Sequence, residues 1–323
     1  MGNPLLDIVV HVEDDFLHAL GIRKAEMRLV SKDESARILG LLHGKPFLVD
    51  AGGGAANTVA GLGLLGGVGA FMGMVGEDEN AQTYEQGLKK SRVDPHLVRG
   101  TQPTGYAITF ITPDGERTFA TYLGSALGFR EEHLNPTNIQ HSAILHIEGY
   151  QLEGEQTRAA EKAMQIAKKH RRQVAISLAD THLIHRTHKH MRRVVEEYAD
   201  IVFLNEQEAQ AFTRKTSEDA LSELARMVRN VAITRGDKGS TLIIEKRRVE
   251  IPAVAVHVEN TNGAGDMYAA GMLYALLRSN NPETIGNIAS WAAAQVVSSP
   301  VARAQRDLRQ EAKELFKQSD INT

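Results

Sequence analysis

Short apolar segments alternate with helix-like segments along most of this 323-residue chain. In the second half, the expected strands and helices follow one another as Ala143–Ile147, Gln156–His170, Gln173–Ser177, His188–Tyr198, Ile201–Leu204, Glu206–Thr213 and Val231–Thr234. Two more strands, Ser240–Glu245 and Val249–Val258, precede a helix over Asp266–Arg278. This alternation predicts an α/β fold in which helices cover both faces of a mainly parallel sheet.

A second, smaller sheet is expected from the first half of the chain. The segments Gly105–Thr112 and Arg117–Tyr122 are rich in β-branched and aromatic residues, and Pro113-Asp114-Gly115 between them has turn chemistry. They predict a hairpin that lies with the early strands Leu5–Val12 and Ala25–Val30. Because the sequence shows no internal repeat or linker, we expect a single domain.

Composition excludes several classes of protein. Lys+Arg 37 and Asp+Glu 40 give 37 − 40 = −3, so the net charge predicts neither a nucleic-acid nor a membrane partner. The absence of cysteine excludes disulfides, a thiolate nucleophile and cysteine-ligated metal sites. No apolar run approaches the roughly 20 residues that span a bilayer. The early residues lack the pattern of a secretory signal, so we expect a cytoplasmic protein.

One glycine run matches the residue pattern of a dinucleotide-binding fingerprint but lacks the secondary structure that the fingerprint requires around it. Gly61-Leu62-Gly63-Leu64-Leu65-Gly66 fits G-x-G-x-x-G, which requires a strand before the first glycine and a helix after it. Here a helix-like segment precedes the run and a strand-like segment follows it. We therefore expect helix packing from these glycines, and an NAD-dependent oxidoreductase remains a disfavoured alternative.

A better-placed glycine run joins a strand to a helix. Gly52, Gly53 and Gly54 follow the apolar segment Phe47–Asp50, and Asn57 lies on the first turn of the helix after them. Ligands of open α/β sheets bind at the carboxyl ends of the strands. The run predicts either a ligand-binding turn or a tight turn with a capping asparagine.

The strongest motif lies between the last expected strand and a long apolar helix. Gly263-Ala264-Gly265 presents successive backbone amides at a helix N-terminus, which is a ready site for an anion. Asp266 follows directly, and we expect the helix dipole to keep its carboxylate ionised. A phosphoryl-binding turn beside an ionised carboxylate is the minimum equipment for phosphoryl transfer to an alcohol.

These motifs resemble those of the ribokinase-like (PfkB) carbohydrate kinases. Residues 260–266, N-T-N-G-A-G-D, resemble the family signature D-T-x-G-A-G-D, and residues 52–57, G-G-G-A-A-N, resemble its N-terminal glycine signature. Residues 205–208 are similar to its N-x-x-E element, residues 234–236 to its T-x-G element, and residues 2–7 to its opening G-x(n)-D. The order agrees from about residue 2 to residue 310. Residues 27–30 and 205–209 are similar to the adenosine-kinase-like branch.

The resemblance implies an ATP- and Mg²⁺-dependent kinase that phosphorylates a primary hydroxyl of a sugar or nucleoside. Asp266 would be the catalytic base, and Gly263, Ala264 and Gly265 would form the anion hole. Implied substrate-binding residues are Asp7, Gly53, Asn57 and Arg117; implied nucleotide-binding residues are Asn205, Thr234, Gly236 and Asn287; and Glu208 is implied to organise magnesium.

The implied fold is ribokinase-like: one domain over residues 1–323, with a small β-sheet lid formed by about residues 8–12, 22–31 and 101–125. The acceptor stays open among adenosine, ribose, fructose and similar compounds, and so does the choice between monomer and homodimer. A catalytically inactive binding protein of the same fold is the alternative function.

Two residues depart from the family pattern, and two other signals are ambiguous. Asn260 replaces the usual aspartate, which leaves ion dependence open, and Arg235 stands where an apolar residue is common. The histidines at 182, 185, 188 and 190 cannot converge on one helix face, so we interpret them as a solvated surface and not as a metal site. Tyr150 would either stack on a ligand or pack at a strand end.

Overall fold

The structure, a computed structural model, describes residues 1–323 except 260, 300, 322 and 323. Its strands are β1 (Leu5–His11), β2 (Met27–Leu29), β3 (Leu48–Gly52), β4 (Gly69–Val75), β5 (Val93–Arg99), β6 (Thr104–Ile111), β7 (Arg117–Gly124), β8 (Ile144–Glu148), β9 (Gln173–Ser177), β10 (Ile201–Asn205), β11 (Asn230–Thr234), β12 (Ser240–Ile244) and β13 (Arg247–Ile251). Asn260, one of the two departures from the family pattern, lies outside the described residues.

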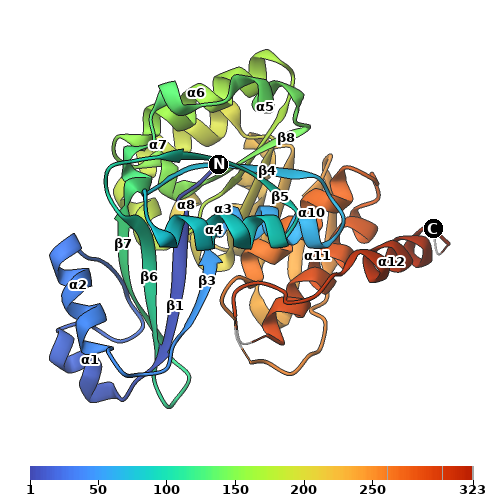
Figure 1. Ribbon diagram of the computed structural model, residues 1–323. Coiled ribbons are helices and arrows are strands. Elements are labelled where there is room, and N and C mark those ends of the chain that lie inside the picture. Colours follow the sequence, from blue (N-terminus) through green and yellow to red (C-terminus); the bar gives the residue numbers. More distant parts are fainter. Residues whose placement is uncertain (260, 300, 322–323) are drawn as a thin grey trace.

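The α-helices are α1 (Asp14–Leu20), α2 (Lys32–Leu41), α3 (Gly54–Leu64), α4 (Glu79–Lys90), α5 (Pro136–His141), α6 (Gln156–Lys169), α7 (Thr181–Tyr198), α8 (Glu206–Thr213), α9 (Ser217–Met227), α10 (Ala264–Leu276), α11 (Pro282–Val297) and α12 (Arg309–Ile321). Figure 1 shows α12 projecting from the body of the protein.

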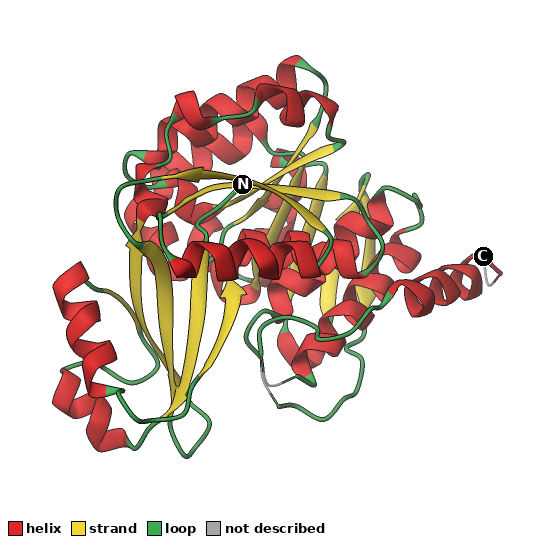
Figure 2. Cartoon of the chain, in the orientation of Figure 1, coloured by secondary structure: helices red, strands yellow, loops and turns green. Residues whose placement is uncertain are grey.

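The larger sheet, the core sheet, has the strand order β13-β12-β11-β10-β9-β8. Strands β8 to β11 pair in parallel, whereas β12 and β13 pair antiparallel at one edge. The sequence-based prediction of a mainly parallel sheet is confirmed for this part of the fold. Figure 2 shows helices beside the strands on both faces.

Amphipathic helices explain why both faces of the core sheet are covered. Ala160, Met164 and Ala167 of α6 recur at helical spacing and are fully buried with apolar residues of α7, α8 and α9. On the other face, α10 and α11 pack their alanine-rich sides against apolar residues of β10, β11 and β12. The parallel strands are therefore buried on both sides, as their apolar composition predicts.

A second sheet has the strand order β2-β7-β6-β1-β3, and we name it the lid sheet after the role predicted for it. The predicted hairpin is confirmed, because β6 and β7 pair antiparallel, and β1 lies parallel to β6. The edge strand β3 belongs to the same sheet and pairs antiparallel with β1, although the predicted lid ranges do not include it. In Figure 1 this sheet extends away from the core sheet, with α1 and α2 beside it.

Several elements differ from the sequence-based expectations. The strand predicted to continue to Val258 ends at Ile251, because its partner β12 begins at Ser240 and offers no pairing beyond that point. Strand β5 went unpredicted, since Pro95 lies within it, and it pairs only with β4. Helix α7 begins at Thr181, well before the expected start, and α9 was also unpredicted.

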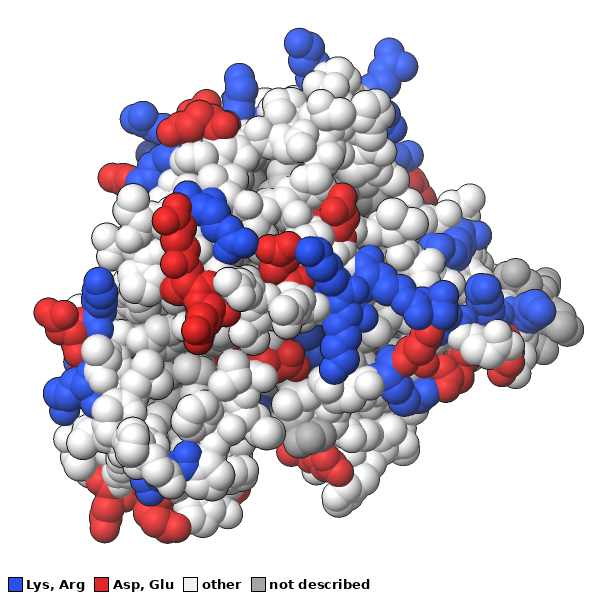
Figure 3. Space-filling model, in the orientation of Figure 1, with Lys and Arg blue, Asp and Glu red and all other residues white. Residues whose placement is uncertain are grey.

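Charged side chains of both signs lie interspersed on the face drawn in Figure 3, in keeping with the small net charge. Around α12, Arg92 and Arg309 both pair with Asp307, and Arg306 pairs with Glu311. Among the described residues, no helix combines the length and the apolarity that crossing a membrane requires.

The G-x-G-x-x-G run lies in and after the C-terminal half of α3, where its glycines permit close packing. A Cβ atom on Gly63 would lie 2.1 Å from the Ser91 carbonyl oxygen, and one on Gly61 would lie 2.5 Å from the Met267 sulfur. No strand leads directly into Gly61, so the run does not have the strand–turn–helix context of a dinucleotide site.

We expect Gly63→Ala to lower the free energy of unfolding by about 1–3 kcal/mol, because the added methyl group overpacks a rigid backbone contact. Denaturant unfolding followed by circular dichroism measures the change. The control is Gly40→Ala on α2, where a Cβ meets nothing within 4 Å and stability is expected to rise slightly. Equal stability of Gly63→Ala and the wild type would contradict this packing role.

Candidate active site

A cleft of about 820 Å³ lies between the lid sheet and the carboxyl-terminal edge of the core sheet. Its walls come from segments far apart in the sequence. The residues that line it include Asp7, Gly53, Asn57, Glu148, Tyr150, Ser177, His182, Gly263, Gly265 and Asp266. The structure therefore brings together most of the predicted substrate-binding and catalytic residues.

Strand register aligns polar residues along this edge of the core sheet. Glu148, the last residue of β8, is the partner of Ser177 at the end of β9, and Asn205 at the end of β10 is the partner of Thr234 at the end of β11. Since these parallel strands end at one edge, their last side chains lie near the same opening, where α/β sheets bind ligands.

The glycine turn after β3 brings two carboxylates close to the start of α3. Gly53 has φ +87°, which favours glycine, and it precedes the first residue of the helix. A Cβ on Gly54 would lie 2.1 Å from Glu148 Oε1 and 3.1 Å from Asp266 Oδ1. Asn57 does not cap the helix, because its side chain is hydrogen-bonded to Asp266 and Arg303. The absence of side chains in the turn makes room for acidic groups that line the cleft.

Asp266 lies on the first turn of α10 and belongs to a hydrogen-bonded chain. Asn57 Nδ2 donates to Asp266 Oδ2 at 3.2 Å, and Arg303 Nε donates to Asn57 Oδ1 at 2.8 Å. The three side chains come from α10, α3 and the loop between α11 and α12. The carboxylate is thus held at the wall of the cleft by a contact between distant parts of the chain.

The acidic groups of the cleft are desolvated, and this sets their protonation. Burial raises the pKa of Asp266 well above its ordinary value, and the neighbouring carboxyl of Glu148 adds to the rise. Burial also raises the pKa of Glu148 to about 7 and that of Asp7 to about 6. Desolvation and like charges therefore act against the helix dipole that we expected to keep Asp266 ionised.

The backbone beside Asp266 has the geometry of an anion-binding turn. Gly263 has φ +77° and precedes α10, which starts at Ala264. The amides of the first turn of a helix have no intrahelical acceptor. That of Ala264 donates to the Thr261 carbonyl at 3.4 Å, and those of Gly265 and Asp266 have no acceptor outside the helix within the described residues, so they are available to a ligand. A Cβ on Gly265 would meet nothing within 4 Å, so this turn faces open space.

A second cavity, of about 230 Å³, continues from Asp266 along the edge of the core sheet. Asn205, Glu208, Thr234 and Gly265 line it. Asn205 and Glu208 form a capping box at the start of α8: Asn205 Nδ2 and its backbone N donate to the two Glu208 carboxylate oxygens at 2.7 and 3.0 Å. Burial raises the pKa of Glu208 to about 7.

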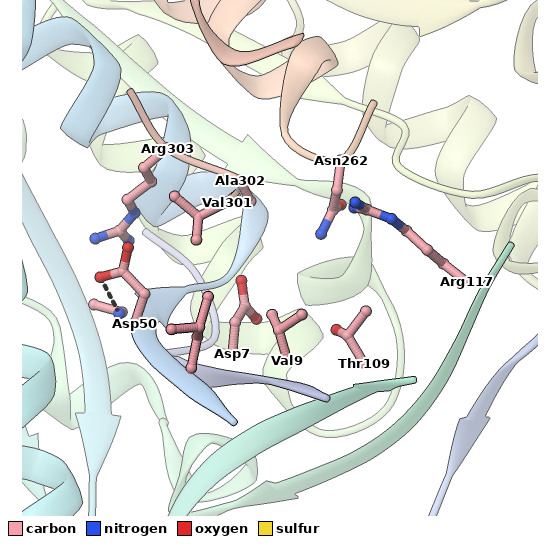
Figure 4. Close-up of a pocket in the computed structure, with 11 residues that line it drawn as sticks. Asp7, Val9, Asp50, Thr109, Arg117, Asn262, Val301, Ala302 and Arg303 are labelled. Atoms are coloured by element: carbon pink, nitrogen blue, oxygen red, sulfur yellow. Dashed lines mark hydrogen bonds between the residues drawn. The ribbon is translucent and has the colours of Figure 1, made fainter. Parts of the chain in front are cut away.

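Four predicted residues do not line these two cavities. One is Ala264, which lies between Gly263 and Gly265, and the other three lie farther from the cleft. Arg117 lines a small cavity of about 20 Å³ beside Asp7, and Figure 4 shows its side chain extending toward Asn262. Gly236 is exposed in a short 3₁₀-helix, and Asn287 is exposed on α11. Neither Gly236 nor Asn287 lines the cavities that hold the other predicted residues.

Sequence reasoning missed two residues: Glu148, which lines the cleft, and Arg303, which lines the small cavity beside Asp7. Glu148 directly follows the expected strand Ala143–Ile147, and this place at a strand end is the signal that marks it. Arg303 is 5% exposed and lies in an irregular loop, where no pattern of spacing marks it. Tyr150 itself lines the cleft.

The four histidines of α7 have different surroundings. Among the described residues, no group of three or more His, Asp or Glu side chains is arranged to hold a metal ion. His188 Nε2 is hydrogen-bonded to the Phe212 carbonyl oxygen, whereas His182 lines the cleft.

Comparison with known proteins gives one consistent result. Residues 22–308 match the model of the pfkB family of carbohydrate kinases. The chain is similar to the crystal structure of adenosine kinase from Sinorhizobium meliloti, with 32% identity, a TM-score of 0.89 and 97% coverage of each chain. It is also similar to a probable sugar kinase from Rhizobium etli, with 29% identity, a TM-score of 0.90, and coverage of 97% of this chain and 96% of that one.

A curated relative agrees with the structures. Adenosine kinase of Saccharomyces cerevisiae is 26% identical over 317 residues, which cover 91% of this chain and 92% of the yeast protein. These matches support the predicted ribokinase-like fold and the adenosine-kinase-like branch. The chain therefore belongs to the pfkB family of carbohydrate kinases, as its motifs predict, and it is a kinase of the sugar and nucleoside type.

Proposed function

We propose that this kinase transfers the γ-phosphoryl group of ATP to the primary hydroxyl of a nucleoside, with adenosine as the first choice. The observation that carries the proposal is the arrangement of Asp266 and the free amides of the α10 turn at one wall of the cleft. A carboxylate and a cluster of backbone donors at one point serve the two needs of the reaction, proton acceptance and stabilisation of the transferring group.

Asp266 accepts the proton of the attacking hydroxyl in this proposal. A base works best when its pKa lies near the working pH, and the raised pKa of Asp266 suits this role. Asn57 orients the carboxylate through its amide. Asp7 and Gly53 hold the sugar hydroxyls, since both line the same cleft beside Asp266.

ATP and Mg²⁺ fit the second cavity by its chemistry. The amides of Gly265 and Asp266 suit phosphate oxygens, and the open space at Gly265 leaves room for them. Both oxygens of Glu208 already accept hydrogen bonds from Asn205, so the pair suits Mg²⁺ contact through water. When bound, the ion and the nucleotide supply charge neutralisation and the phosphoryl group. Thr234 lines the same cavity, and we assign Gly236 and Asn287 to its outer rim.

Apolar side chains of the lid sheet favour a nucleoside over a free sugar as the acceptor. Leu5, Ala107, Met27 and Phe119 form an apolar wall of the cleft, and Met27 is the strand partner of Phe119 in the β2–β7 pair. A flat aromatic base gains from such a wall, whereas a free sugar is polar all round. We assign residues 8–12, 22–31 and 101–125, together with β3, to a lid that closes over the acceptor and excludes water. Arg117 then approaches the phosphate.

We expect Phe119→Ala to raise KM for adenosine about tenfold with little change in kcat, because the side chain contacts the base and not the reacting atoms. Steady-state ADP release measures both constants. Phe47→Ala is the matched control, since Phe47 is exposed outside the cleft. An unchanged KM in Phe119→Ala would contradict the base-binding wall.

A panel of acceptors tests the proposed substrate class. ADP release from ATP and Mg²⁺ is measured with adenosine, other nucleosides, ribose and fructose. The proposal predicts the highest kcat/KM for a nucleoside. A higher value for ribose or fructose would leave the kinase chemistry in place and overturn the nucleoside assignment.

The cytoplasmic location remains a prediction, consistent with the absence of cysteine.

A further inference from the structure

Arg303 is a buried cation with an unusual set of contacts. It lies in the loop between α11 and α12, outside every motif, and is 5% exposed. Its Nε donates to Asn57, and the guanidinium also interacts with the buried hydroxyl of Tyr84. No carboxylate lies within ion-pair distance of Arg303 in the described part of the chain, and its Nη atoms lack well-aligned acceptors there. A buried guanidinium without a paired carboxylate is costly, and such costs are found at functional sites.

The contact with Arg303 decides which way the Asn57 amide faces. A guanidinium has donors only, so the atom of Asn57 that faces it must be the carbonyl oxygen Oδ1. The NH₂ group must then point away from Arg303, and there it donates to Asp266 Oδ2. Without Arg303, the amide is free to rotate by half a turn and to present its oxygen to the carboxylate.

The positive charge of Arg303 and the hydrogen bond from Asn57 both lower the pKa of Asp266. This charge lowers the pKa of Asp7 and of Asp266 against the larger effect of burial. The other titratable groups around this point are Asp50 on β3, Tyr84 on α4 and Glu148 on β8. In Figure 4, Arg303 and Asp50 lie beside Asp7 around the small cavity.

We propose that Arg303 is a positioning residue for phosphoryl transfer, which fixes the amide of Asn57 so that this amide donates to Asp266. The inference rests on the proposed function, in which Asp266 is the base. Arg303 acts through Asn57 and does not touch the reacting atoms. A purely structural role, in which Arg303 only anchors its loop, predicts lower stability but no effect on the titration of Asp266.

The first test observes Asp266 without turnover. The side-chain carboxyl of Asp266 is titrated by ¹³C NMR in the ligand-free protein and assigned with Asp266→Asn. In Arg303→Met its midpoint is expected to rise by about one pH unit or more, because both the charge and the oriented donor are lost. In Arg172→Met the midpoint stays unchanged, since Arg172 bonds a backbone carbonyl away from the cleft.

Asn57→Ala provides the same test should Arg303→Met fail to fold, because it removes the donor and leaves the arginine in place. Its Asp266 midpoint is also expected to rise. Arg303→Lys keeps a cation and a donor, so we expect a midpoint closer to that of the wild type. A midpoint unchanged from the wild type in Asn57→Ala or in a folded Arg303→Met would overturn the proposal.

The second test is a double-mutant cycle on turnover. Arg303→Met is expected to lower kcat about tenfold or more and to change KM for the acceptor much less. If Arg303 acts through Asn57, Arg303→Met/Asn57→Ala loses no more than Asn57→Ala alone; losses that multiply would contradict this route. A wild type that phosphorylates no acceptor would refute the proposed function instead, while the NMR titration would still decide the role of Arg303.

Discussion

Asp266→Asn is expected to lower kcat by roughly 10²–10⁴-fold while KM for the acceptor stays nearly constant, because the amide keeps the shape of the carboxylate but cannot accept the proton. The pH dependence follows from the same group. Burial raises the pKa of Asp266, so wild-type kcat should rise with pH as the carboxylate ionises. Steady-state ADP release across the pH range measures both effects.

Stability provides an independent reading of this variant. A carboxyl whose pKa is raised by folding destabilises the folded state once the pH exceeds its unfolded value, since the charged form is disfavoured in the cleft. The neutral asparagine removes this cost, so Asp266→Asn should be as stable as the wild type or more stable at pH 8. Asp33→Asn, in the first turn of α2, is the control and should leave both activity and stability unchanged. Wild-type turnover in Asp266→Asn would contradict its role as the base.

Gly265→Val is expected to lower kcat by about 10²-fold or more, because its side chain would fill the space in front of the amides that bind the phosphoryl group. A Cβ at this position meets no protein atom within 4 Å, so the free energy of unfolding should change little. Steady-state kinetics and denaturant unfolding measure the two quantities on the same preparation.

The matched control introduces the same side chain where no ligand is expected. Gly40 on α2 also has open surroundings, so Gly40→Val should leave turnover unchanged. Full activity of Gly265→Val would show that the α10 turn does not bind the transferring group. A large loss of stability would instead show that the turn is more tightly packed than the structure indicates.

Local patterns were enough to predict the core of this fold. The strands β8 to β11 are short, apolar and separated by helices, and both their parallel pairing and their coverage on two faces agree with the prediction. The turn before α10 was equally visible, because Gly263 and Gly265 can only be explained by a special backbone or a close ligand. Consecutive residues carry the whole of this information.

Features that depend on distant partners could not be predicted. The alternating valines at 254, 256 and 258 have the pattern of a strand, but strand β13 ends at Ile251 where its partner β12 has no further residue. Arg303 contacts Asn57 across 246 positions of sequence, and the local sequence around either residue gives no sign of this contact. The raised pKa of Asp266 could not be predicted for the same reason, since Glu148 and Asp7 reach this carboxyl only in the folded chain.

Product analysis with the wild type and Asp266→Asn tests the central claim most directly. Each protein is incubated with ATP, Mg²⁺ and adenosine, and ³¹P NMR quantifies ADP and nucleoside monophosphate over time. We predict equal amounts of ADP and adenosine 5′-monophosphate from the wild type and only a trace of either from Asp266→Asn. ADP that forms without a phosphorylated alcohol, or equal product from the two proteins, would contradict phosphoryl transfer to a hydroxyl at Asp266.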